Sequence, residues 1–198
     1  MTKVFNILTI LSLTGFLFFF SSCGETKTAT EEETVSENTD ATEPAEDKSN
    51  RPSPPAVATS TIGGATVTID YSSPAVKGRT IWGDLVPYGE VWRTGANEAT
   101  TFTADKNVTI NGQALPAGRY GLFTIPTEGD WTVVFNSVAD QWGAYEYDES
   151  KDVLRVSAKT HPLDESAERL KFDIAADGTV TLSWDKMAVD FTVAEAGN

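Results

Sequence analysis

The stretch RLKFDIAADGTVTLSWDKMAVDFTV, residues 169–193, decides the fold class. Apolar and polar side chains alternate along it, which is the pattern of strands with one buried face. The apolar positions are Leu170, Phe172, Ile174, Val180, Leu182, Trp184, Met187, Val189, Phe191 and Val193. Gly178 permits a tight turn after the first run, and Asp185–Lys186 predicts a second turn. The stretch therefore predicts three antiparallel strands joined by short turns.

The same alternation continues toward the N-terminus, in ATVTIDY (65–71) and VLRVSAK (153–159). Asn111-Gly112 lies between two short extended pieces and is a strong hairpin signal. GRYGLFTI (118–125) and WTVVFN (131–136) are apolar on both faces, as central strands are. About nine short strands result, and their apolar faces must be covered. We therefore expect an all-β fold, an antiparallel β-sandwich first and a barrel or jelly roll second.

Two long segments break the alternation: Ser72 to about Glu98, and Asn136 to Asp152. Long connections without regular structure are uncommon in compact domains and are often functional. We expect the two segments to form one recess of polar and aromatic side chains. The candidate ligand-binding residues are Trp92, Arg93, Asn97, Glu98, Asp140, Gln141, Trp142 and Tyr145.

Three blocks of this sequence are GRTIWGDLVPYGEVWRTGANEATTF, LPAGRYGLFTIP and DQWGAYEYD. In this order they resemble the motif blocks of a family known as domain of unknown function 2911, over roughly residues 66–193. The resemblance implies a β-rich fold and an exported, lipid-anchored protein, mostly of Bacteroidota. It implies no activity, so it assigns no catalytic residue.

Arg93 carries a planar guanidinium suited to a carboxylate or phosphate ligand. It could equally form a buried structural pair with Glu98 or Asp140. Asn97 also suits a turn, in which its side chain would bond nearby backbone. Each tryptophan of the irregular segments could be a platform for a sugar ring or an apolar plug under its loop. These alternatives stay open on the sequence alone.

The leading hypothesis is a non-catalytic binding or envelope-associated module for an anionic or sugar-like ligand. The first alternative is a hydrolase of glycans or peptides, with Glu98 and Asp140 as acid and base; glycosidase carboxyls lie about 5–5.5 Å or 6.5–9.5 Å apart. The second is a structural or assembly protein without a small-molecule site. His161 is the only histidine and no serine has a nucleophile-elbow pattern, so neither a triad, a metal site nor a cofactor is expected.

Residues 1–22 have the layout of a secretory signal, with Lys3 followed by the apolar run VFNILTILSLTGFLFFF and two serines. Cys23 follows directly, which resembles a bacterial lipobox, so we expect cleavage before Cys23 and lipid attachment to it. The apolar run would span roughly 25 Å as a helix, short of a ~30 Å hydrocarbon core. These features predict an exported protein, held in the cell envelope by lipid on Cys23, with the outer membrane as the expected location.

Residues 24–50 contain nine acidic residues, two lysines and no aromatic residue. Such a composition predicts a disordered tether, so we expect residues 23–55 to be a linker and 56–198 a single domain. The tether supplies −7 of the total net charge of −14. Since nucleic-acid binding requires a basic surface, no nucleic-acid partner is expected.

Overall fold

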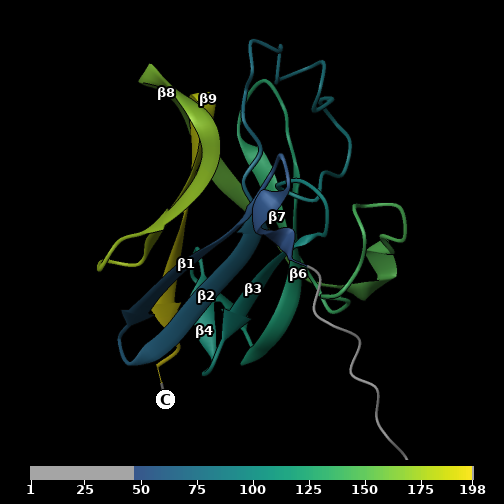
Figure 1. Ribbon diagram of the computed structural model, residues 1–198. Coiled ribbons are helices and arrows are strands. Elements are labelled where there is room, and N and C mark those ends of the chain that lie inside the picture. Colours follow the sequence, from purple (N-terminus) through teal and green to yellow (C-terminus); the bar gives the residue numbers. More distant parts are fainter. Residues whose placement is uncertain (1–46, 198) are drawn as a thin grey trace, which may run out of the picture. The chain divides into compact units, whose positions relative to one another are not determined.

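The computed structural model describes residues 47–197 and is almost entirely antiparallel β-structure in this part of the chain (Figure 1). Two short 3-10 helices accompany the strands. The elements are η1 (Lys48–Asn50), β1 (Pro55–Ile62), β2 (Ala65–Ser72), β3 (Thr100–Ala104), β4 (Val108–Ile110), β5 (Gln113–Leu115), β6 (Gly118–Ile125), β7 (Trp131–Asn136), η2 (Glu149–Lys151), β8 (Asp152–Ile174) and β9 (Thr179–Glu195).

The nine strands form one continuous sheet in the order β1-β2-β3-β6-β7-β8-β9-β4-β5. The two layers of the fold belong to this one sheet because β8 and β9 are long. β8 pairs with β7 as far as Ala158 and with β9 from Lys159 onward, while the end of β9 pairs with β4. The sheet thus folds over its own apolar side into a sandwich-like domain. The predicted all-β antiparallel fold is confirmed.

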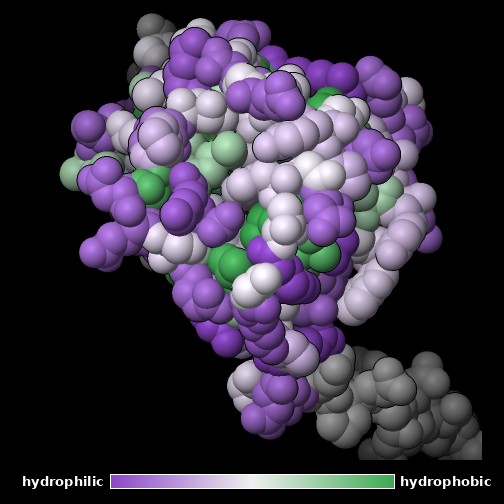
Figure 2. Space-filling view, turned by 90° about the horizontal axis from the view of Figure 1, so that it is seen from above, coloured by the Kyte–Doolittle hydropathy of each residue, from purple (hydrophilic) through white to green (hydrophobic). Residues whose placement is uncertain are grey.

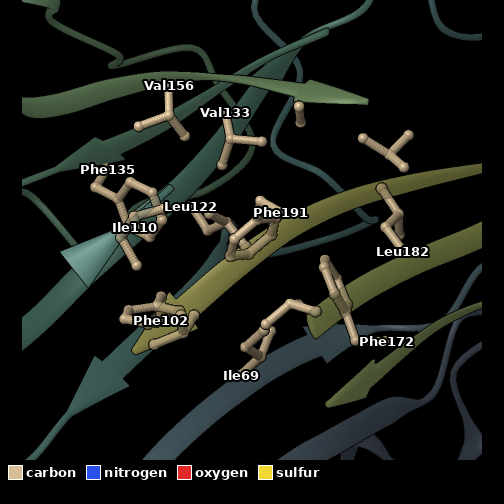
Figure 3. Packing of buried hydrophobic residues seen from close by; sticks show 14 of the residues in the cluster. Ile69, Phe102, Ile110, Leu122, Val133, Phe135, Val156, Phe172, Leu182 and Phe191 are labelled. Atoms are coloured by element: carbon tan, nitrogen blue, oxygen red, sulfur yellow. The ribbon is translucent and has the colours of Figure 1, made fainter. Parts of the chain in front are cut away.

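The core lies between the two layers and receives side chains from all nine strands. The edge strand β1 contributes least, because most of its residues are exposed or only partly buried. Ile69 of β2, Phe102 of β3 and Leu122 of β6 face Phe172 of β8 and Phe191 of β9 (Figure 3). All five are at most 4% exposed. Burying one such side chain contributes about 1.5–3 kcal/mol, so these five together contribute on the order of 10 kcal/mol.

Two of the three predicted turns are confirmed, and the third is wrong. Asn111 and Gly112 join β4 to β5 with positive φ angles of 47° and 79°, as predicted. Gly178 has φ 88° before β9, and a Cβ there would overlap the carbonyl of Val193. The turn predicted at Asp185–Lys186 is wrong, because β9 continues through it. Asp185 has φ 51° beside a register shift, so it forms a bulge and the next residues still pair with β8.

The ordered part begins earlier than the predicted boundary at residue 56. Asp47 caps η1 by accepting the N–H of Ser49, and Pro55 already begins β1. The Pro54 carbonyl accepts the N–H of Ser73 from the end of β2. Residues 47–55 are called the strap below. The predicted signal (1–22), Cys23 and the tether up to residue 46 lie outside the described residues.

β6 and β7 are buried on both faces, as their apolar sequences predict. Their inner face joins the main core, while Phe123 and Val134 form an outer cluster with Ala99. Val91, Ile125, Ala144 and Tyr147 pack against this cluster. The outer cover is therefore supplied by the two irregular segments, which structurally are residues 73–99 and 137–151.

Candidate functional site

The two irregular segments meet on the outer side of the sheet. Glu98 and Trp142 form an antiparallel bridge. The N–H of Ala99 donates to the Gln141 carbonyl at 3.0 Å, and the N–H of Gly143 donates to the Asn97 carbonyl at 3.1 Å. The structure thus brings Asn97 and Glu98 of the first segment next to Gln141 and Trp142 of the second, more than 40 positions away in the sequence. All four are predicted site residues.

The loop before this bridge is held in a strained conformation. Trp92 and Thr124 exchange two backbone hydrogen bonds of 2.8 and 2.9 Å. Thr94 is fully buried with φ 57°, and its hydroxyl donates to the Trp92 carbonyl and to the Thr124 hydroxyl. A positive φ is unusual for a β-branched residue, so the surrounding bonds must enforce it. Asn97 also has a positive φ of 58° and donates to the Ser53 carbonyl of the strap.

Trp92 does not line a surface site. It is 9% exposed and packs in the core against three other tryptophans. Its ring centroid lies 5.8 Å from Trp82, 6.3 Å from Trp131 and 5.8 Å from Trp184. For Trp82 and Trp92, the structure therefore matches the interpretation of a plug under the loop. The recess expected around Trp92, Arg93 and Trp142 does not include Trp92.

An open recess of about 280 Å³ lies beside the bridge between the segments. Its lining comes from the strap, from β2 and β3, from Arg119 of β6, and from residues 139–141. This recess contains Glu98, Asp140 and Gln141 of the predicted residues. The charged lining residues number three cations and three acids: Lys48, Arg51, Arg119, Asp70, Glu98 and Asp140.

Glu98 is bonded to the strap. Lys48 Nζ donates to Glu98 Oε1 at 2.7 Å, and Arg51 Nη1 lies 3.0 Å from both Glu98 oxygens. Partial burial opposes the charged form of Glu98, but hydrogen bonds from Lys48, its own backbone and Arg51 outweigh it. Together they lower the pKa of Glu98 to about 2. Glu98 is therefore ionised at neutral pH.

Trp142 lies on the same side of the bridge as Glu98 and is 56% exposed. The Arg51 guanidinium carbon lies 6.0 Å from its ring centroid, within cation–π range. The strap therefore contacts both partners of the bridge. Large exposed apolar side chains are otherwise scattered over the domain, and the face in Figure 2 is mainly hydrophilic with small, separate hydrophobic areas.

Asp140 and Gln141 form the opposite wall of the recess. The side chain of Asp140 is 84% exposed and pairs with Arg119 at 2.7 Å. Gln141 is 8% exposed, and its Nε2 donates to the Val138 carbonyl at 2.8 Å. Its Oε1 is buried without a partner, and so is Oγ1 of Thr101 in the same lining. Buried oxygens without a hydrogen-bond partner are rare in native proteins. This wall of the recess contains two of them, Gln141 Oε1 and Thr101 Oγ1.

Arg93 lies apart from this recess. It is half-buried, and its Nη1 is 3.9 Å from where a Cβ of Gly143 would stand. Burial lowers the pKa of Arg93, while the neighbouring phenol of Tyr145, itself 85% exposed, raises it. Within residues 47–197, Arg93 has no ion pair and its Nε has no hydrogen-bond partner. The structural pair with Glu98 or Asp140 is therefore wrong, since those carboxylates bind other cations.

A buried polar network holds the base of the second segment. The Asp152 side chain is 8% exposed and accepts hydrogen bonds from Tyr147, Asn136 and Arg155. Burial and the bond to Asp152 raise the pKa of Tyr147 to about 12, despite the opposing bond from Arg155. The network has no opening to the recess and serves to hold residues 137–151 in place.

Sequence reasoning missed Lys48, Arg51, Asp70, Thr101 and Arg119. Alternation in ATVTIDY does place Asp70 on the outer face, but the strand pairing that sets Asp70 opposite Thr101 cannot be read from one strand. Lys48 and Arg51 fell in the predicted linker. Among residues 47–197, no helix is long and apolar enough to span a membrane. No cluster of three potential metal ligands occurs in the same range.

No match is found among the curated proteins or the solved structures. A family model matches residues 53–193, which leaves Lys48 and Arg51 outside the match but contains the irregular segments and every strand except the last two residues of β9. The family is described as Protein of unknown function (DUF2911). With most of its length matched by this model, the chain belongs to the DUF2911 family.

Proposed function

We propose that this protein is a non-catalytic binding module of the cell envelope that binds a polar ligand in the recess. The observation that carries the proposal is the construction of the recess. Two segments distant in sequence pair with each other beside an open hollow of about 280 Å³, and the hollow is lined by charged groups, with two orphaned oxygens buried in its wall. Ligand sites are commonly concave, with a few convergent polar groups.

The location belongs to the proposal as well. The signal of residues 1–22 and the lipobox-like Cys23 support export and attachment to a lipid bilayer. The tether then separates the anchor from the strap, where the ordered domain begins. Because Lys48 and Arg51 of the strap line the recess, the recess lies where the linker joins the ordered domain.

The charges of the recess favour binding over acid–base catalysis. A glycoside hydrolase needs one protonated carboxyl as its general acid. Glu98, with a pKa of about 2, is a carboxylate held by two cations. Asp140 is largely exposed and paired with Arg119. Glu98 therefore does not have the raised pKa that a general acid requires at neutral pH.

The test is a binding comparison on the full-length protein in detergent micelles. The protein is applied to an array that carries neutral, amino and anionic glycans. Ala139 lines the recess, so Ala139→Phe should fill it and reduce binding about tenfold or more. The matched control is Val138→Phe, which alters the neighbouring, 41% exposed position outside the lining. Equal binding by wild type and a folded Ala139→Phe variant would remove the recess as the site.

A further inference from the structure

The bonding state of the recess residues indicates which ligand chemistry the recess suits. All three cations of the lining already have anionic partners: Lys48 and Arg51 bind Glu98, and Arg119 binds Asp140. A negatively charged ligand would therefore have to compete with a carboxylate of the protein for each of them. The formal charges of the lining balance, three positive and three negative.

In the part of the chain that the structure describes, three side-chain groups of the lining lack a partner, and among them only the Asp70 carboxylate, a pure hydrogen-bond acceptor, is exposed to a ligand. Within residues 47–197, the exposed Asp70 carboxylate makes no hydrogen bond or ion pair. Thr101 lies directly opposite Asp70 in the sheet register, and its hydroxyl oxygen is buried without a partner. Since the Gln141 amide nitrogen donates to Val138, its amide oxygen is the atom left without a bond. Thr101 is 4% exposed and Gln141 8%, so both are more than nine-tenths buried.

The size and surroundings of the recess narrow the ligand further. Its volume of about 280 Å³ is at the lower limit of ligand sites, about 300–1,000 Å³, which suits one sugar ring rather than a long chain. Tyr71 and Pro55 provide apolar surface in the lining. Adjacent hydroxyl groups on a ring can donate to several acceptors at once while the ring packs on apolar atoms.

We infer that the recess binds a saccharide unit through hydroxyl or amino groups that donate to the exposed carboxylate of Asp70, rather than an anion. This inference rests on the proposed function and specifies the ligand class of the same recess. The cations of the lining then act indirectly, since they hold Glu98 and Asp140 in the walls. The negative charge of the domain adds to the preference against anions.

The test uses three matched monosaccharides, D-glucose, D-glucosamine and D-glucuronate, titrated into the full-length protein in micelles and followed by ligand-observed NMR. Glucose and glucosamine should bind, and glucuronate should bind at least about tenfold more weakly. Asp70→Ala removes an exposed side chain without partners, so it should fold normally. It should weaken glucosamine binding about tenfold, as expected for a lost charge-assisted hydrogen bond.

Thr68→Ala is the control, because Thr68 lies on the same face of β2 but outside the recess lining. It should leave all three affinities unchanged. Glucuronate binding equal to or tighter than that of the other sugars would overturn the inference while leaving a binding recess. Absence of binding by all three sugars would also overturn it. The proposed function, in contrast, fails only if Ala139→Phe and wild type behave alike on the glycan array.

Discussion

The two irregular segments are built in opposite ways. Residues 73–99 enter the main core with Ile81, Trp82, Val86 and Trp92, and are fixed by backbone bonds to β6. Residues 137–151 contribute nothing to that core. Only Ala144 and Tyr147 pack on the outer cluster. Polar bonds supply the rest of the anchorage, from the Asp152 network and from the bridge to residues 97–99.

This difference assigns different roles to the two walls of the recess. The first segment is fixed by apolar burial, so Glu98 is presented from a rigid support. The second is held by polar bonds near the surface, and such segments open at lower free energy than the core. Adjustment to a ligand should therefore occur at residues 139–141, while the Glu98 side stays in place.

The largest effect should follow from breaking the apolar anchor of the first segment. Trp92→Ala removes the ring that packs on Trp82, Trp131 and Trp184. Large-to-small core substitutions of this kind cost about 3–5 kcal/mol of unfolding free energy, measured by urea denaturation. Trp142→Ala, at a 56% exposed position in cation–π contact with Arg51, should cost only about 1 kcal/mol. Similar losses of unfolding free energy in both variants would contradict the difference in anchorage between the two segments.

The second segment should respond to loss of its polar anchor. Asp152→Ala leaves Tyr147, Asn136 and Arg155 without their shared acceptor, and breaking a buried pair costs about 3 kcal/mol or more. Burial would still raise the pKa of Tyr147, but loss of the bond to Asp152 should lower it from about 12, as followed by ultraviolet absorbance. Glu149→Ala removes only an exposed partner of Arg155 and should cost about 1 kcal/mol at most. An unchanged Tyr147 titration in Asp152→Ala would show that the network is not the anchor.

The sequence predicts the strands well because burial on one face leaves a period of two in each strand by itself. Asn111-Gly112 is likewise a local signal, since the turn needs positive φ at both positions. Asp185 is a residue type common in turns, yet it forms a bulge because the next residues pair with Lys159–Pro162 of β8. The local sequence gives no sign of this pairing.

The candidate site was only partly predictable for the same reason. Long, irregular segments with aromatic and charged residues did mark Glu98, Asp140 and Gln141. Which charged residues pair with each other depends on how the fold places them, and this cannot be read from their spacing in the sequence. Arg93 and Glu98 are five positions apart, yet Glu98 binds Lys48 and Arg51 of the strap, about 50 positions away. Lys48 and Arg51 lie in a segment whose mainly acidic composition predicts a linker, so the sequence alone does not predict them in the site.

A smaller effect is expected where the strap joins the segments. Glu98→Gln removes partly exposed ion pairs with Lys48 and Arg51, so it should cost about 1 kcal/mol or less at pH 7. The folded-state pKa of Glu98, about 2, is below its ordinary 4.5. The stabilisation is therefore fully present above pH 4.5 and is lost as the pH falls toward 2. Denaturation at pH 7, 4 and 2.5 should show wild type and variant converging in acid.

Release of the strap gives a second measurement for the same variant. Trypsin should cleave after Lys48 faster in Glu98→Gln, because Lys48 loses its anionic partner. Glu195→Gln, which removes the 3.7 Å pair with Lys106, is the control and should not alter this cleavage. A constant stability difference from pH 7 to 2.5, with no change in cleavage, would contradict a clasp formed by Glu98.

The smallest effect is expected at Arg93, where the two segments approach each other at Gly143. Arg93 is half-buried without an ion pair, so its charge is desolvated with no compensating partner in residues 47–197. Arg93→Met keeps much of the side-chain volume and should change unfolding free energy by less than about 0.5 kcal/mol, or raise it slightly. Arg155→Met is the matched control and should cost more, since it leaves the buried Asp152 without its cation. A loss of several kcal/mol in Arg93→Met would mean that Arg93 itself joins the two segments, and the division into an apolar and a polar anchor would then be incomplete.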